Sequence, residues 1–212
     1  MRKSFDAELL ELGESMTAMA DTVRSAIEEV TRSLNEGDEA AARTVAATTA
    51  NVDQMERDIE NRCLSLLLRQ QPVARDLRTI STALKMVTDL QRIGDQAANI
   101  AELSLLMARQ GRARVPGHIG TMSQKAGIMV SQAIAAYTDR DVEQARAVVN
   151  LDDEVDDLFA AVKAELIDRI LENRDEADSA IDLIIIAKYL ERVADHAVNI
   201  AQWAVFCVTG QL

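Results

Sequence analysis

Residues 90–101, LQRIGDQAANIA, return 100 positions later as LERVADHAVNIA at residues 190–201. Seven of these twelve positions are identical. The correspondence continues upstream, where Asp53 matches Asp156 at an offset of 103 residues. Because apolar and polar residues of the first half match those of the second half at these offsets, the sequence indicates two copies of one supersecondary unit.

Apolar side chains recur at intervals of three and four residues, as in Ile186, Leu190 and Val193. This spacing is typical of amphipathic α-helices, and no stretch shows the alternation of a half-buried strand. Pro72 and Pro116 both fit the first turn of a helix, where a missing N–H group costs nothing. Glycine, proline and polar runs divide the chain into six predicted helices, at residues 4–36, 38–70, 73–110, 116–138, 140–172 and 176–209.

Long helices joined by short turns pack as antiparallel neighbours. The sequence therefore predicts an all-α protein of six long antiparallel helices, arranged as two tandem repeats of an elongated three-helix bundle. We expect the first repeat at residues 1–110, a linker at 111–117 and the second repeat at 118–212. A twofold relation and a translational relation between the repeats would bury the same apolar stripes, so both remain open.

The interior must consist mainly of aliphatic side chains, because 48% of the residues are hydrophobic but only 3% are aromatic. This composition argues against an all-β fold. Cys63 and Cys207 stand among apolar neighbours and are expected to be packed, reduced thiols. Four methionines at helical spacing are expected to fill the core: Met16, Met19, Met122 and Met129.

The chain is acidic, with a formal net charge of −12 at pH 7. This charge disfavours nucleic acid and anionic lipid surfaces as partners, and it favours cations or basic protein surfaces. The first residues lack the apolar block of a secretory signal, and the uncharged stretch at residues 197–212 is too short to span a membrane. We therefore expect a cytoplasmic protein without direct membrane insertion.

Two pairs of acidic residues in the second repeat are spaced to share one face of a helix. Asp152 and Asp156 form one pair, and Glu191 and Asp195 form the other. Acids four residues apart lie about 6 Å from each other at Cβ, near enough for both to reach one hard cation. Antiparallel packing about a turn near residue 174 would bring all four carboxylates to one height of the bundle. Their mutual repulsion would favour a bound metal ion.

Oxygen ligands alone would suit Mg, Mn, Ca or Fe ions better than zinc. Binding should then weaken as the pH falls toward about 4, where carboxylates take up protons. The alternative is that these acids are simply solvated, since an acidic protein contains such pairs by chance. Helical register supports this alternative in part, because with Leu190 and Val193 facing the core, Glu191 and Asp195 point away from it.

The first repeat lacks the leading acid of each pair. Its counterparts are Thr49 with Asp53 and Gln91 with Asp95, so only two carboxylates remain. We expect a weaker metal site there, or none.

Arg92 and Arg192 each stand three residues before an aspartate, Asp95 and Asp195, which favours intrahelical ion pairs. His196 projects about 100° around the helix from Asp195 and is expected at the surface or between helices, not as a metal ligand. The sequence contains no Gly-rich phosphate loop, no nucleophile elbow, no Cys-His arrangement and no Glu-x-x-His metal motif. We therefore predict that the protein is not an enzyme.

In its longer motifs the sequence resembles the PhoU family. The resemblance rests on the doubled pattern Arg-Ile/Val-Gly/Ala-Asp-x-x-x-Asn-Ile, at residues 92–100 and 192–200. Further matches are the stretch from Arg69 to Arg78, which reads RQQPVARDLR, and the acidic run at residues 152–156. The resemblance covers nearly the whole chain.

This resemblance implies a cytoplasmic regulator of phosphate uptake and phosphate homeostasis that is a negative regulator of the phosphate-starvation response. It implies coupling between the ATPase of a phosphate ABC transporter, which is PstB-like, and a PhoR-like sensor histidine kinase. A homodimer is expected, peripheral at the inner face of the membrane through the transporter.

The family's acidic motif is associated in some members with metal ions or iron clusters. Arg92 and Arg192 could also sense phosphate, because guanidinium matches phosphate geometry. The alternative function is a metal-binding helical scaffold or interaction protein unrelated to phosphate signalling.

Overall fold

The structure is a computed structural model that describes residues 2–70, 74–110 and 114–211. Every regular element in these ranges is a helix, which confirms the predicted all-α class. The six long helices are α1 Arg2–Glu36, α2 Glu39–Gln70, α3 Ala74–Gln110, α4 Gly117–Asp139, α5 Val142–Glu172 and α6 Ala177–Thr209. A short 3₁₀ turn, η1 Arg174–Glu176, precedes α6.

Aspartates begin two of the helices within one residue or two of the predicted boundaries. The Asp38 carboxylate accepts hydrogen bonds from the backbone N–H groups of Ala40 and Ala41, at 3.0 and 3.1 Å, and so begins α2. The Asp141 carboxylate accepts one from the Gln144 N–H group at 3.0 Å and begins α5. Aspartate is favoured at both positions because its oxygen satisfies N–H groups that have no partner inside the helix.

Two boundary predictions were wrong in detail. Arg140 is not in a helix but adopts the left-handed conformation, with φ of 58°, and ends α4. Pro116 precedes the first turn of α4 instead of lying in it. Pro72 and the first part of the predicted linker, residues 111–113, lie outside the described residues.

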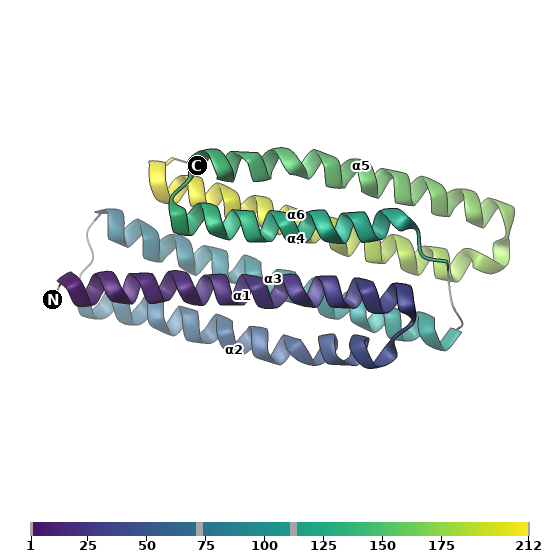
Figure 1. The fold of residues 1–212 in the computed structure, drawn as a ribbon, viewed down its shortest axis with the longest axis horizontal. Coiled ribbons are helices and arrows are strands. Elements are labelled where there is room, and N and C mark those ends of the chain that lie inside the picture. Colours follow the sequence, from purple (N-terminus) through teal and green to yellow (C-terminus); the bar gives the residue numbers. More distant parts are fainter. Residues whose placement is uncertain (1, 71–73, 111–113, 212) are drawn as a thin grey trace.

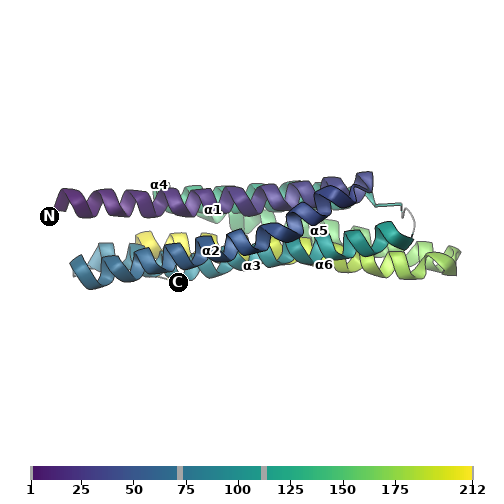
Figure 2. The ribbon, with the colours of Figure 1, turned by 90° about the horizontal axis from the view of Figure 1, so that it is seen from below.

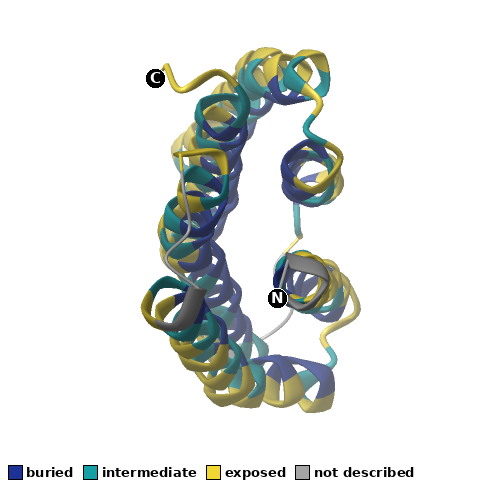
Figure 3. Cartoon of the chain, turned by 90° about the vertical axis from the view of Figure 1, so that its left-hand side faces the viewer, coloured by how far each residue is buried: buried dark blue, intermediate teal, exposed yellow. Residues whose placement is uncertain are grey.

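The helices form two layers (Figures 1 and 2). One layer contains four helices in the spatial order α5, α6, α3 and α2, and the other contains α4 and α1. Viewed from one end, the four-helix layer curves around the two helices of the smaller layer (Figure 3). Buried residues lie on the facing sides of both layers, so the core runs along the whole length of the molecule.

The two repeats are related by an approximate twofold rotation and not by a translation. Figure 1 shows α1 running in the opposite direction to α4, and α3 in the opposite direction to α6. Both of these pairs are in contact. The hairpin between α2 and α3 and the hairpin between α5 and α6 therefore lie at opposite ends of the molecule (Figure 1).

A polar contact joins the repeats where α3 meets α6. Asp89 lies between the His196 ring and the Asn199 amide, with its Oδ1 2.9 Å from His196 Nδ1 and 3.4 Å from Asn199 Nδ2. His196 thus lies between helices, which is one of the two places expected for it. The Asp89 and His196 side chains are partly buried, so their contact satisfies polar groups that water reaches only in part.

The core is aliphatic and tightly packed. All four methionines predicted to fill it are fully buried, and Cys63 and Cys207 are buried free thiols. Small residues allow close approach of helices. At Gly94 on α3, a Cβ atom would lie only 2.9 Å from Val52 Cγ1 on α2. Among the described residues, no helix is both long enough and apolar enough to cross a membrane.

Candidate functional site

The acidic pairs of the second repeat meet between α5 and α6, as their spacing predicts. We refer to Asp152, Asp156, Glu191 and Asp195 as the acid cluster. Helical register places it there, because Val155 and Leu190 are buried, and acids beside these residues lie at the edge of the contact between the two helices.

The four carboxylates differ in burial. Asp156 and Asp195 are exposed. The Glu191 side chain is only 13% exposed, so the prediction that it points to the surface was wrong. Its place beside the α5–α6 contact explains the difference. Oδ1 of Asp152 is buried and has no hydrogen-bond partner in the described part of the chain. An unpaired buried oxygen is costly, and a carboxylate in this position is suited to receive a cation.

The electrostatics agree with this geometry. Burial, followed in order by the negative charges of Asp156, Asp195 and Glu191, raises the pKa of Asp152 to about 6. All four carboxylates are therefore close enough to interact. Proton uptake near pH 6 relieves their repulsion, and a bound cation would relieve it at higher pH.

Lys188 borders the acid cluster and also lies, like Lys163, over the Phe159 ring. Lys188 on α6 forms an ion pair with Glu191 Oε2. Its Nζ atom also lies 5.6 Å from the centre of the Phe159 ring, and Nζ of Lys163 lies 5.7 Å from the same ring. Both distances are within cation–π range. Lys188 therefore supplies positive charge to the buried end of the cluster.

These residues have the chemistry of a hard-cation site, but their oxygen atoms do not converge on one point. Among the described residues, no three carboxylate, imidazole or thiol groups are arranged closely enough to hold a metal ion. A metal ion would require these carboxylates to move closer together, above all those of Asp156 and Asp195, which are exposed. Their exposure leaves them the freedom to do so.

Replacing Asp152 by asparagine should stabilise the metal-free protein at neutral pH. Since the folded-state pKa is raised from 3.8 to about 6, the folded protein binds this proton more tightly than the unfolded chain does. That contribution to stability is fully present below about pH 4 and is lost as the pH rises through 6. The Asp152→Asn variant should gain about 1 kcal/mol or less at pH 7.5 after allowance for solvent screening, and nothing at pH 4. Urea unfolding in the presence of a chelator measures the difference.

Asp157→Asn is the matched control, because Asp157 lies on the same helix and is exposed. A gain from Asp152→Asn that is equal at the two pH values would contradict the raised pKa.

In the first repeat, the side-chain amide of Gln91 lies between the two remaining acids, Asp53 and Asp95. Nε2 of Gln91 donates hydrogen bonds to Asp53 Oδ1 at 3.3 Å and to Asp95 Oδ1 at 3.0 Å. The Arg92 guanidinium adds a bond to Asp95 Oδ2 at 3.3 Å, which confirms the predicted intrahelical pair. The Gln91 amide thus lies where a cation would bridge the two carboxylates, and this half does not fit a metal ion.

The predicted pair in the second repeat is absent, because no ion pair joins Arg192 to Asp195 within the described residues. Sequence reasoning missed the roles of three residues, Lys188, Gln91 and Asp89. The spacing of Lys188, three residues before Glu191, could have predicted their ion pair. No local signal links Asp89 to α6, since this contact spans more than 100 residues.

The family comparison matches both repeats. The model described as "PhoU domain" matches residues 16–104 and again residues 119–204. The first match runs from Met16 in α1 to Ser104 in α3, and the second covers most of α4–α6. The acid cluster lies in the second match, and the site around Gln91 lies in the first.

Similar proteins extend over nearly the full length. A protein from Clostridium acetobutylicum, named a phosphate-specific transport system accessory protein PhoU homolog, is 31% identical over 211 residues, which cover 99% of this chain and 96% of that protein. A protein of the same name from Aquifex aeolicus is 35% identical over 205 residues, which cover 97% of this chain and 93% of the relative. The crystal structure of PhoU from Pseudomonas aeruginosa superposes with a TM-score of 0.92 at 30% identity, covering 98% of this chain and all of that one.

Proposed function

This chain belongs to the PhoU family, and we propose that it is an accessory protein of phosphate-specific transport that regulates phosphate homeostasis. The observation that carries the proposal is the match of both repeats over nearly the full length of relatives that bear this name. A match limited to one repeat would support only a shared fold.

The finer part of the proposal concerns its partners. The protein would act as an adaptor between the transporter ATPase and a sensor histidine kinase, and would repress the phosphate-starvation response while phosphate is plentiful. An elongated bundle with long exposed helix faces suits an adaptor, because it can present separate surfaces to two proteins. Its acidic surface favours basic faces on these partners.

We also propose that the protein works by binding and without catalysis, in the cytoplasm, and as a homodimer. The sequence lacks the phosphate loops and nucleophile motifs of enzymes that act on phosphates. The long flanks of the bundle offer area for pairing.

A metal ion at the acid cluster is part of the proposal. Asp152 and Glu191 would hold it from the buried side, and Asp156 and Asp195 from the exposed side. The unpaired Oδ1 atom of Asp152 and the raised pKa of this group support the fit. The ion, of the Mg, Mn, Ca or Fe type, would supply positive charge that joins α5 to α6.

Deletion of the gene tests the regulatory role. A strain without the protein should express its phosphate-starvation genes in phosphate-rich medium, because the adaptor that reports transporter state to the kinase is missing. Reporter expression from a phosphate-starvation promoter measures the effect, and the wild-type gene supplied on a plasmid is the control. Normal repression in the deletion strain would refute the proposal.

A further inference from the structure

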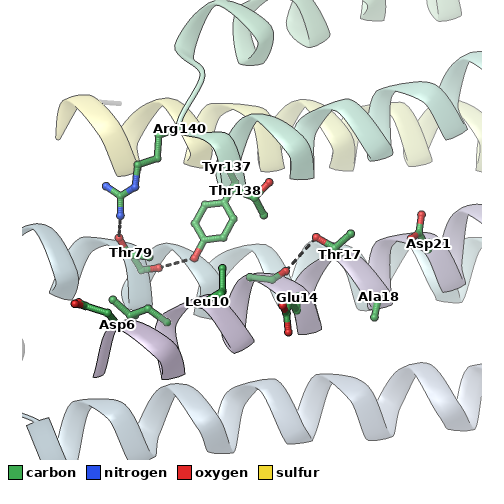
Figure 4. A pocket seen from close by; sticks show the side chains of 12 residues that line it. Asp6, Leu10, Glu14, Thr17, Ala18, Asp21, Thr79, Tyr137, Thr138 and Arg140 are labelled. Carbon is green, nitrogen blue, oxygen red and sulfur yellow. Dashed lines mark hydrogen bonds between the residues drawn. The ribbon is translucent and has the colours of Figure 1, made fainter. Parts of the chain in front are cut away.

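A groove lies between α1 and the end of α4 (Figure 4), and no residue of the acid cluster lines it. It encloses about 590 Å³. Thr79 of α3 forms part of its floor. The Tyr137 hydroxyl donates a hydrogen bond to the Thr79 carbonyl oxygen at 3.1 Å, and the Arg140 guanidinium donates one to Thr79 Oγ1 at 2.9 Å. These bonds join α3 to the end of α4 and make one wall rigid.

The other wall is one continuous face of α1. The residues that line it are Asp6, Leu9, Leu10, Gly13, Glu14, Thr17, Ala18 and Asp21. They recur at three and four residues, so they form a straight stripe along the helix. From Asp6 to Asp21 the stripe spans fifteen residues, or about 22 Å.

The middle of this stripe is apolar and shallow. Leu10 is 67% exposed and lies among the small residues that line the groove, so its side chain offers apolar surface to a partner. Gly13, Thr17 and Ala18 are small, so the backbone of another helix can approach α1 closely there. Small residues beside an exposed leucine form a shallow groove, into which a row of side chains on another helix can pack.

The rim of the groove is acidic. Asp6, Glu14 and Asp21 are spaced by eight and seven residues, close to two turns each. Within the described residues, Asp6 and Glu14 have no ion-pair partner, and Asp21 meets Arg24 only at 3.8 Å. The one basic lining residue, Arg140, is bonded to Thr79. Cationic groups at two-turn spacing would therefore find unpaired carboxylates along the groove.

From these features we propose that the groove binds a basic amphipathic helix of a partner protein. Apolar side chains of that helix pack on Leu10, Gly13 and Ala18, and its Lys or Arg residues pair with Asp6, Glu14 and Asp21. This is helix-in-groove recognition with complementary charge. A second copy of this chain, with a net charge of −12, fits the acidic rim less well, so the homodimer proposed above is assigned to the flanks of the bundle and not to this groove. The inference rests on the adaptor role proposed above, for which it names the chemistry of one partner.

A synthetic helix tests the groove directly. The probe is a peptide of about 18 residues with leucines along one face and lysines beside them at two-turn spacing. Its control has the same composition with the leucines and lysines distributed around the helix. Fluorescence anisotropy with the full-length protein should show tighter binding of the patterned peptide. Equal affinity for both peptides, or no binding of the patterned one, would overturn the proposal.

Variants locate the binding site. Asp6→Lys combined with Glu14→Lys should weaken binding of the patterned peptide by about tenfold, since two rim carboxylates are lost and repulsion replaces them. The control, Asp157→Lys with Asp168→Lys on α5, changes the net charge equally outside the groove and should leave the affinity unchanged.

Leu10→Glu should also weaken binding, and because Leu10 is exposed, the variant keeps the fold. If the groove variants bind the peptide as well as the α5 control does, the site assignment is wrong. The peptide experiments test only the groove, and the deletion strain tests only the regulation of phosphate-starvation genes. Either proposal can therefore fail without the other.

Discussion

At the metal site proposed above, a chain carrying Glu191→Gln with Asp195→Asn should bind no metal ion, whereas a chain carrying Asp53→Asn with Asp95→Asn should bind metal as the wild-type chain does. The reason is the difference between the two repeats. The second repeat brings four carboxylates together, and one of them has a buried oxygen without a partner. Ligand charge sets much of the affinity for a hard cation, and the α6 variant removes two of the four negative charges.

In the first repeat the cation position is already filled by a neutral donor. The Gln91 amide donates to Asp53 and to Asp95, and Arg92 supplies the only positive charge that bonds to this pair among the described residues. A metal would have to displace the amide and would gain only two carboxylates. Asparagine at positions 53 and 95 should therefore change folding stability slightly and metal content not at all.

The measurement is elemental analysis after loading with Mg, Mn, Ca or Fe ions separately and removal of free metal. Binding should weaken as the pH falls below about 6, because burial and the neighbouring carboxylates raise the pKa of Asp152 to about 6 and its proton then competes with the metal. This onset lies above the value near 4 that ordinary carboxylates would give.

Loss of metal from the first-repeat variant alone would overturn the assignment. If the wild-type protein holds no metal under any loading condition, the acids of the cluster are simply solvated and do not form a metal site. In that case the raised pKa of Asp152 would reflect mutual repulsion and burial without a bound ion.

Gly94→Ala should destabilise the protein by about 1–3 kcal/mol, although alanine is the better helix former. On an open helix this exchange stabilises by up to about 1 kcal/mol. At Gly94 the new Cβ would lie 2.9 Å from Cγ1 of Val52, which is buried and cannot rotate away easily because its side chain is β-branched. The overpacking cost then exceeds the gain in helix propensity.

Gly13→Ala is the matched control, because Gly13 is also inside a helix but its Cβ would meet only Thr138 Cγ2 at 3.7 Å. This variant should be neutral or slightly more stable. Val52→Ala removes the methyl groups that the new Cβ would meet, so the double variant should cost less than the sum of Gly94→Ala and Val52→Ala. Urea unfolding measures the wild type, the three single variants and the double variant. A stabilising effect of Gly94→Ala would show that α2 and α3 pack less closely than the structure indicates.

The sequence by itself determined the helices and the repeat. Helical periodicity, turn residues and capping aspartates act over three or four residues, so segments such as 38–70 were predicted within one residue of their ends. The same short-range rules predict that the four acids lie level with one another along the bundle. In an antiparallel helix pair, residues equally far from the connecting turn lie opposite each other. Buried methionines followed from the same periodicity.

Only the tertiary structure decided how distant segments meet. Both a twofold and a translational relation between the repeats satisfy the apolar stripes, and the contacts of α3 with α6 and of α1 with α4 selected the twofold. The Asp89–His196 contact follows from that choice. The groove beside Leu10 exists because α4 ends at Asp139 beside α1, a fact that no local pattern records. Local sequence sets which face of each helix is apolar, but the mutual fit of side chains across helices sets which faces meet.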